Sequence, residues 1–367
     1  MPTPTKESIT EALGKVVDPT FDKPMLDIGT LSDIEVVDGK VSLTAQLSSP
    51  ADAIRELART RIREALEAAG VTDADVNWKI QVPTREVMGD DPLPGVRNVV
   101  LVMSGKGGVG KSTVATNLAV ALKRMGMRVG LLDADMYGPS IPTMLGVRGA
   151  PHSTDGKKIQ PLQRFGIGLM SMGFLVEDAK QAIVWRGPML HGALRQFVID
   201  VDWGELDFLV LDLPPGTGDV ALTLSQLFKV TGVLMVTTPQ EVALEDVYKG
   251  VDMCKKLQLP ILGVVENMSF FVDSAGVKHE LFGAGGGEKI AEFAEAPLLG
   301  QVPIDPQVRV WGDEGTPIVQ AAPGSEPAKT FMNIADKLTT RIAVEQFERG
   351  GGKSVPGDGP KRLRIVR

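Results

Sequence analysis

The sequence is poor in the residues that build disulfides and metal sites. Its 367 residues include one cysteine, Cys254, and three histidines, at positions 152, 191 and 279. A single thiol excludes an intrachain disulfide, and it excludes a zinc or iron-sulfur site made from several thiolates of one chain. The histidines lack metal-ligand spacing, so we expect structural roles for them; a hard-metal site formed by His279 with Asp273 is the less favoured alternative.

The sequence also lacks the features of membrane and nucleic-acid binding. No run of roughly 18 apolar residues could span a bilayer, and the first residues lack the apolar core of a signal peptide. Lys and Arg total 39 against 46 Asp and Glu, a net charge of -7, and the few aromatic residues form no stacking pattern. A net negative charge gives no attraction to phosphate backbones. We therefore expect a cytoplasmic protein with no membrane or nucleic-acid partner.

Composition and length indicate a folded protein of more than one domain. Hydrophobic residues make up 43% and charged residues 23% of the chain, which is ordinary for globular proteins. A chain of 367 residues exceeds the size at which single cores stop growing. The 41 glycines exceed the usual share and suggest tight loops near a ligand.

Residues 1–82 are predicted to form a small α/β domain of order αββαβ. Asp38-Gly39 favours a two-residue turn that closes a hairpin. Apolar periodicity places the other elements. They are a helix marked by Ile9, Leu13 and Val16, strands over 33–37 and 40–47, a helix over 54–66, and a strand over 76–82.

A second, larger α/β domain follows a short linker. Residues 83–96 contain three prolines and no periodicity, which indicates the linker. In residues 97–349, apolar strands alternate with helical patterns, which predicts a doubly wound, mainly parallel sheet. The predicted strands lie near 98–103, 128–133, 207–212, 232–237, 261–266 and 298–302, and a last helix is marked by Phe331, Ile334, Ala335, Leu338 and Ile342. Residues 350–367 are predicted to be a flexible basic tail.

The strongest motif is a phosphate-binding loop. The apolar strand 98–103 runs into Ser104–Thr113, which contains G-x-x-x-x-G-K-S. Glycines let successive N–H groups converge on phosphate oxygens, and the following helix directs its positive end there. Lys111 is expected to neutralise the β- and γ-phosphates, and the Ser112 hydroxyl to bind magnesium. The predicted nucleotide-binding residues are Gly105, Lys106, Gly107, Gly108, Val109, Gly110, Lys111, Ser112 and Thr113.

Acidic and amide side chains follow neighbouring strands of the predicted sheet. Asp135 and Asp212 stand where the carboxyl ends of parallel strands form a ligand crevice. We expect Asp212 to contact magnesium through water and Asp135 to orient the attacking water, although strand-end Asp residues can also be caps. Asn267 and Pro303 are predicted to form the base site; a turn-forming role for Asn267 is the alternative.

The loop and several other segments resemble a known family. Gly-Lys-Gly-Gly-Val-Gly-Lys-Ser-Thr resembles the deviant Walker A motif of the MinD/ParA superfamily, which implies that Lys106 reaches the nucleotide of a partner subunit and acts in catalysis with Lys111 and Asp135. Residues 93–345 resemble the Mrp/ApbC family of ATPases, and the first domain resembles the small domain that precedes many of them. The matching segments are Trp185–Leu190, Asp202–Asp207, Asp212–Asp219, Glu266–Ser269 and Phe282–Glu288.

The resemblance implies a slow, partner-stimulated ATPase, with magnesium, that carries iron-sulfur clusters as a homodimer and delivers them to apoprotein or assembly-factor clients. The sequence departs from the family where many members have Cys-x-x-Cys, because Asp273 and Gly276 occupy those positions. The cysteine position of the small domain is also empty, because Ser48–Asp52 contains no cysteine, and Cys254 shares a helical face with apolar residues. The departure leaves open whether a cluster is bound. The alternative is a MinD/ParA-like nucleotide-controlled switch that binds no cluster.

Overall fold

The computed structural model describes residues 5–37, 40–87, 89–136, 138–153, 156, 158–175, 187–216 and 218–352. They form two compact units: one contains the described residues up to Thr84 together with those from Asp336 onward, and the other runs from Arg85 to Ala335. The predicted turn at Asp38-Gly39, Trp185 and most of the predicted tail lie outside these ranges. Within them, no helix combines the length and hydrophobicity needed to cross a bilayer.

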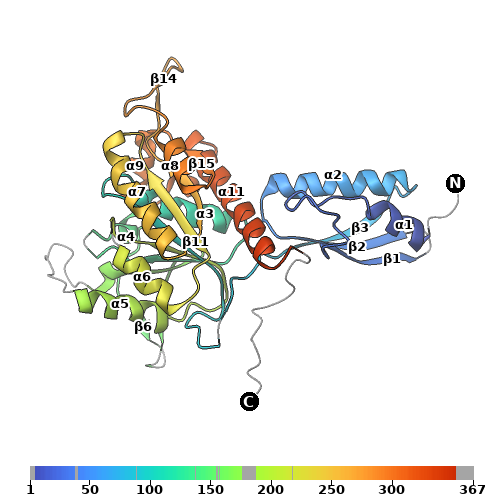
Figure 1. The fold of residues 1–367 in the computed structure, drawn as a ribbon, viewed down its shortest axis with the longest axis horizontal. Helices are drawn as coiled ribbons and strands as arrows, with labels where there is room; N and C mark the ends of the chain where they lie inside the picture. The colour runs from blue at the N-terminus through green and yellow to red at the C-terminus, as the bar shows by residue number, and fades with distance from the viewer. Residues whose placement is uncertain are drawn as a thin grey trace. The chain divides into compact units, whose positions relative to one another are not determined.

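The first unit has the predicted αββαβ order (Figure 1). Strand β2 pairs antiparallel with β1 and parallel with β3, giving the sheet order β1-β2-β3. The parallel pair requires a crossover connection, which α2 provides. Side chains from both helices and the sheet share one buried core that includes Ile9, Leu13, Leu43 and Ile62. The elements are α1 (Lys6–Leu13), β1 (Leu31–Val37), β2 (Lys40–Leu47), α2 (Asp52–Ala68) and β3 (Ala74–Ile80).

The last helix, α11 (Glu326–Arg349), contributes to both units. In the first unit, the hydroxyl of Ser49 lies 3.2 Å from that of Thr339, and Phe347 stacks on Phe21 with ring centroids 4.3 Å apart. The sequence instead places all residues up to 349 in the ATPase domain. Helical periodicity shows that a helix exists, but it does not show which core each of its turns enters.

Asp336 in the first unit makes the stability of this unit depend on pH. Burial, and second the nearby charge of Asp52, raise the pKa of Asp336 to about 6. A raised folded-state pKa means that the ionised form is disfavoured by folding. The free-energy cost of holding the ionised carboxylate in the folded protein is therefore nearly absent below about pH 4 and fully present above about pH 6.

We expect Asp336→Asn to stabilise the protein at pH 7.5 by about 1 kcal/mol, a value reduced for partial solvent exposure. At pH 3 the variant and the wild type should unfold at the same temperature, because Asp336 is then largely protonated in both the folded and the unfolded state. Thermal unfolding followed by circular dichroism at the two pH values tests this. A variant that is less stable than the wild type at pH 7.5 would contradict it.

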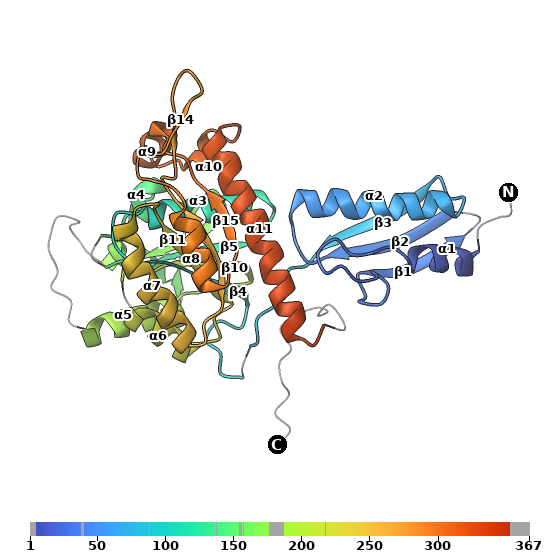
Figure 2. The ribbon, with the colours of Figure 1, turned by 45° about the horizontal axis from the view of Figure 1, so that its top comes forward.

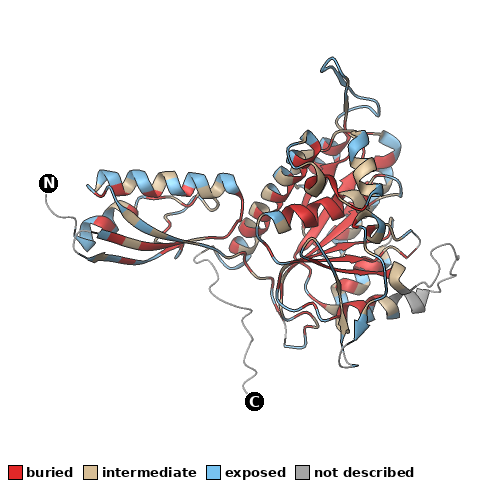
Figure 3. Cartoon of the chain, turned by 180° about the vertical axis from the view of Figure 1, so that it is seen from behind, coloured by how far each residue is buried: buried red, intermediate tan, exposed pale blue. Residues whose placement is uncertain are grey.

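The second unit is built on a sheet of eight strands among the described residues, in the order β15-β12-β11-β4-β10-β5-β9-β8. All neighbouring pairs are parallel except β8 with β9. The six strands between the two edge strands, β15 and β8, are buried almost throughout (Figure 3), as expected for a parallel sheet covered on both faces. The strands of the sheet are β4 (Val96–Ser104), β5 (Val129–Asp133), β8 (Leu162–Arg164), β9 (Ile167–Ser171), β10 (Leu206–Asp212), β11 (Gly232–Thr237), β12 (Ile261–Glu266) and β15 (Leu298–Gln301).

Helices cover both faces of this sheet. Residues of α5, α6, α7 and α8 enter one buried cluster with one face of the strands. On the other face, α3 contacts β4, β5 and β10 and packs against α10. These helices are α3 (Lys111–Arg124), α4 (Ile141–Met144), α5 (Gly187–Ile199), α6 (Gly218–Leu227), α7 (Glu241–Lys256), α8 (Gly286–Ala294), α9 (Pro306–Asp313) and α10 (Ile318–Ala321), with a 3-10 turn at Met172–Leu175.

Two parts of this unit differ from what the sequence predicts. Strands β8 and β9 extend the sheet, although β9 is interrupted by Gly168 and is too short to show a clear pattern. The predicted linker is folded onto the second unit: the guanidinium of Arg85 is buried and lies 2.5 Å from the carboxylate of Asp91. Arg85 also donates to the carbonyl of Leu93. Prolines and charges therefore mark a non-periodic segment here, but not an exposed one.

Candidate functional site

The loop between β4 and α3 has the curled backbone that the glycine motif predicts. Gly108 has φ of 83° and Gly110 has φ of 78°, which is the left-handed region that favours glycine. At Gly105, a Cβ atom would lie 2.4 Å from the amide nitrogen of Val247 in α7. The loop surrounds a cavity of about 250 Å³, lined by its own residues together with Asp135, Gly138, Ser140, Met144 and Pro215.

Lys111 and Ser112 are bonded to Asp212. The ammonium nitrogen of Lys111, the first residue of α3, lies 2.5 Å from Oδ1 of Asp212, and the Ser112 hydroxyl donates to Oδ2 at 2.5 Å. Burial raises the pKa of Asp212, and the charge of Lys111 opposes that shift. Hydroxyl and carboxylate oxygens are the hard ligands that Mg²⁺ prefers. Ser112 and Asp212 therefore fit a magnesium site beside the loop.

Asp133 has a structural role that the sequence does not predict. Its carboxylate accepts hydrogen bonds from Ser171 Oγ at 3.0 Å, the Ile141 amide at 3.3 Å and the Asp135 amide at 3.2 Å. These bonds fix both ends of the loop that carries Asp135. Burial, and second the charge of Asp212, raise the pKa of Asp133 to about 7. The Asp-x-Asp spacing at a strand end is the signal that could have indicated this role.

Two further loops line the same cavity. The carboxylate of Asp135 accepts from the amide of Gly138 at 3.2 Å, and both residues line the cavity together with the phosphate loop. In the loop after β10, the Gly216 amide donates to the carbonyl of Ser104 at 3.1 Å, and Pro215 lines the cavity. The second loop follows β10, the neighbour of β4, and the first follows β5, the next strand beyond β10. A group bound at the phosphate loop would therefore contact all three segments.

Lys106 lies at the edge of this cavity and is half-buried. Its carbonyl accepts a hydrogen bond from the Ser104 hydroxyl at 3.0 Å, which fixes its backbone. Within the described ranges, its ammonium group forms no ion pair. Lys111 and Lys106 thus differ: one is bonded to a buried carboxylate and the other is available to a group outside the chain.

The predicted base residues lie beside the loop. Asn267 and Pro303 line a larger, mostly apolar cavity of about 850 Å³, which shares Thr113, Ser140 and Met144 with the phosphate cavity. The two cavities are therefore adjacent. The side-chain nitrogen Nδ2 of Asn267 donates to the carbonyl of Val109 in the loop at 2.9 Å, so this side chain also contacts the phosphate loop itself.

A second glycine-rich segment, Phe282–Glu288, leads into helix α8. A carboxylate of the protein itself accepts a hydrogen bond from the first turn of this helix. The amide of Gly287, in the first turn of α8, donates to Oε2 of Glu266 at 2.5 Å. The other oxygen of Glu266 accepts from Ser269 at 2.7 Å and from Gln301 at 3.0 Å. A Cβ atom at Gly287 would lie 2.8 Å from that of Glu266. These glycines let α8 approach β12 closely. The backbone amide of Gly287 in the first turn of α8 has Glu266 as its hydrogen-bond partner.

A small hairpin at one end of the second unit (Figure 2) is made of β13 (Phe271–Val272) and β14 (Lys278–His279). Asp273 and Gly276, at the positions of the family's cysteine pair, lie between its two strands. The Asp273 carboxylate accepts from the amides of Ala275 and Val277, both at 2.9 Å, and lies 2.8 Å from Nε2 of His279. His279 and these amides lower the pKa of Asp273. Among the described residues, no group of three His, Cys, Asp or Glu side chains could hold a metal ion.

Cys254 is fully buried in the core, as its helical position predicts. Burial raises the pKa of its thiol to about 12. A protonated, buried thiol is neither a nucleophile nor a metal ligand. Cys254 is therefore a packing residue.

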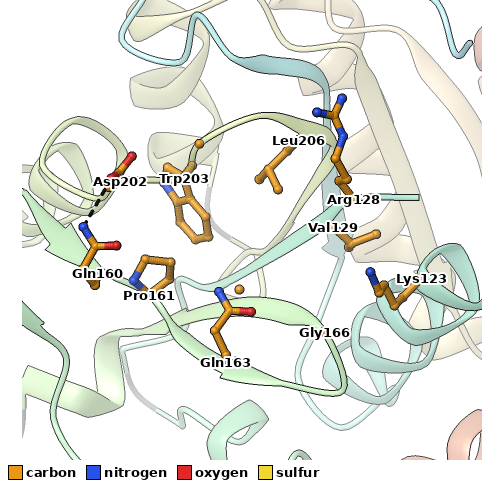
Figure 4. A pocket seen from close by; sticks show the side chains of 12 residues that line it. Lys123, Arg128, Val129, Gln160, Pro161, Gln163, Gly166, Asp202, Trp203 and Leu206 are labelled. Carbon is orange, nitrogen blue, oxygen red and sulfur yellow. Dashed lines mark hydrogen bonds between the residues drawn. The ribbon is translucent and has the colours of Figure 1, made fainter. Parts of the chain in front are cut away.

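Figure 4 shows a further cavity, of about 340 Å³. Its lining includes Val129 and Leu206, which begin β5 and β10, so it lies at the opposite end of these strands from the phosphate loop. Trp203 contributes its indole ring to the lining, and Lys123 and Arg128 also line the cavity. Arg128 is bound to the carboxylate of Asp207 at 2.9 Å, and Gln160 donates to Asp202 at 3.2 Å. Parallel sheets bind ligands at the carboxyl ends of their strands, and this cavity is at the amino ends.

The fold and the site together define a P-loop NTPase domain. Among solved structures, the nucleotide-binding protein from Archaeoglobus fulgidus, in complex with ADP, is 39% identical with a TM-score of 0.54, covering 63% of this chain and 92% of that chain. The cell division ATPase MinD of Pyrococcus furiosus is 27% identical with a TM-score of 0.50, covering 66% and 98%. The predicted fold class is confirmed.

Both units match known families. Residues 95–339 match the model of the NUBPL iron-transfer P-loop NTPases, and residues 6–78 match that of the iron-sulfur cluster assembly proteins. The iron-sulfur cluster carrier protein of Synechocystis sp. is 42% identical over 348 residues, 93% of this chain and 98% of the relative. The iron-sulfur cluster transfer protein NUBPL of Mus musculus is 46% identical over 268 residues, 72% and 83%. The chain belongs to this Mrp/ApbC and NUBPL family, as predicted.

Proposed function

We propose that the protein binds ATP at the phosphate loop and hydrolyses it to ADP and phosphate. The amides of Gly105 to Thr113 surround the β- and γ-phosphates, and Lys111 exchanges its bond with Asp212 for one with phosphate. Ser112 and Asp212 would hold a magnesium ion, which would neutralise charge on the phosphates. The base occupies the larger cavity next to Asn267 and Pro303. The observation that supports this is the pairing of Lys111 and Ser112 with one buried carboxylate beside the loop.

Rapid hydrolysis in this proposal depends on a homodimer. Asp135 faces the phosphate cavity and orients the attacking water. Lys106 forms no ion pair within the described chain, and it places its charge on the transferring phosphoryl group of the partner subunit. Without a partner the second positive charge is missing from each site. Turnover is therefore slow in the monomer and is stimulated by association.

We further propose that the ATPase acts in iron-sulfur cluster assembly or delivery to apoprotein or assembly-factor clients in the cytoplasm. Support comes from the two family matches, which cover both units of the chain. The cluster is cargo, and this chain offers it no thiolate: Asp273 takes part in closing the hairpin and Cys254 is buried. The thiolates of a bound cluster must come from a small thiol or from a client.

Cluster transfer tests this role. Protein reconstituted without oxygen with iron, sulfide and glutathione should transfer a cluster to an acceptor apoprotein, faster with ATP than without. Cys254→Ala is the matched control and should transfer equally well, because the buried thiol is not a ligand. No transfer to the acceptor, with or without ATP, would contradict the carrier role and would favour the nucleotide-controlled switch that binds no cluster.

A further inference from the structure

One side chain that is not part of the phosphate loop forms a hydrogen bond with the loop's backbone. Asn267, directly after β12, donates from Nδ2 to the carbonyl oxygen of Val109 at 2.9 Å. A carbonyl only accepts hydrogen bonds, so the side-chain atom that faces it is the nitrogen. Asn267 is 6% exposed, so water competes little for this bond. The bond therefore joins the end of β12 to the backbone of the loop.

Asn267 is itself fixed in place. Its backbone amide donates to the carbonyl of Thr237 at the end of β11, at 2.8 Å. The preceding residue, Glu266, is buried and binds the first turn of α8 through Gly287. The ends of two central strands and a helix thus set the position of the Asn267 amide before any ligand binds.

The same amide also limits movement of the loop toward β12. Gly110 ends the loop in the left-handed conformation, and a Cβ atom there would lie 2.1 Å from Nδ2 of Asn267. The two groups are therefore in close contact. The hydrogen bond to Val109 opposes movement of the loop away from β12, and this contact opposes movement toward it.

We propose that Asn267 is a positioning residue that keeps the phosphate loop in its phosphate-binding conformation, in addition to lining the base cavity. This rests on the proposed binding of nucleotide at the same loop. A side chain that acts on the loop affects every ligand that has phosphates, whether or not it has a base. A side chain that only reads the base affects nucleotides alone. The two roles therefore separate when ligands with and without a base are compared.

The test compares magnesium with ATP and magnesium with inorganic tripolyphosphate as ligands of the full chain, by calorimetry. We expect Asn267→Ala to weaken tripolyphosphate by about 10-fold, the effect of one lost hydrogen bond in a buried site, and ATP by at least as much. Weaker binding of ATP with unchanged binding of tripolyphosphate would overturn the proposal, because it would leave only a base-reading role. Unchanged binding of both would overturn it as well.

A second variant keeps the size of the side chain. In Asn267→Asp a carboxylate oxygen faces the Val109 carbonyl, so two acceptors oppose each other, and we expect both ligands to lose at least as much affinity as in Asn267→Ala. Thr238→Val is the matched control: Thr238 is buried directly after β11, its hydroxyl has no hydrogen-bond partner among the described residues, and both affinities should stay at the wild-type value.

Hydrogen exchange separates a local effect from general destabilisation. In both Asn267 variants the amides of residues 107–111 should exchange faster while those of β4 and β10 keep their protection. Equal acceleration in the loop and the strands would overturn the proposal. If the wild type binds neither ligand, the proposed function itself fails. If it binds both and Asn267→Ala does so equally well, only the positioning role fails.

Discussion

Replacing Lys106 with alanine should leave ATP binding within about twofold of the wild type and slow ATP hydrolysis by at least about 100-fold. The binding groups of the loop belong to the same chain and are untouched. Lys106 forms no ion pair among the described residues, and its charge is proposed to act on the phosphoryl group of a partner subunit. A positive charge placed on a transferring phosphoryl group stabilises the transition state more than the bound ATP.

Three measurements check this expectation. Calorimetry gives the ATP affinity, phosphate release gives turnover, and light scattering gives the mass with and without ATP. Lys106→Ala should also lose ATP-dependent dimerisation, whereas Lys106→Arg keeps the charge and should retain part of both activities. Wild-type turnover and dimerisation in Lys106→Ala would show that this lysine is a solvated side chain of the loop.

Replacing Lys111 with alanine should remove detectable ATP binding and lower the free energy of unfolding by about 3 kcal/mol. The first effect follows because Lys111 is the cation at the centre of the phosphate loop. The second follows because its ammonium, 6% exposed, is the partner of the buried carboxylate of Asp212. Removal of one member of a buried ion pair leaves the other charge without compensation.

A double variant separates the two effects. In Lys111→Met with Asp212→Asn, neither charge remains, so stability should return to within about 1 kcal/mol of the wild type. ATP binding should stay absent, because neither side chain can contact phosphate or magnesium in the predicted way. Denaturant unfolding and calorimetry on the three proteins provide the data. Recovery of ATP binding in the double variant would show that Lys111 supports the fold and not the ligand.

The sequence predicts the main strands and the phosphate loop because their signals are local. A parallel strand buried on both faces is a continuous apolar run, so β11 and β12 begin and end where they are predicted. The loop motif requires glycine where the backbone adopts the left-handed conformation, as at Gly108 and Gly110. Asp212 is expected beside the loop because the carboxyl ends of parallel strands form one ligand crevice.

Other features depend on contacts between distant residues, which the sequence does not show. The C-terminal half of α11 belongs to the first unit because Thr339 and Phe347 meet Ser49 and Phe21 there. Asp133 gains its role from Ser171 on β9, a strand that the sequence does not predict. The contact of Asn267 with the loop joins residues that are 158 positions apart.

Calorimetric titration of the purified protein with magnesium and ATP tests most directly whether the phosphate loop is a nucleotide site. We predict saturable binding of one ATP per chain that requires magnesium and is lost in Lys111→Ala. A titration that shows no saturable heat with the folded wild-type protein would contradict nucleotide binding, and with it the proposed hydrolysis and ATP-dependent delivery of clusters.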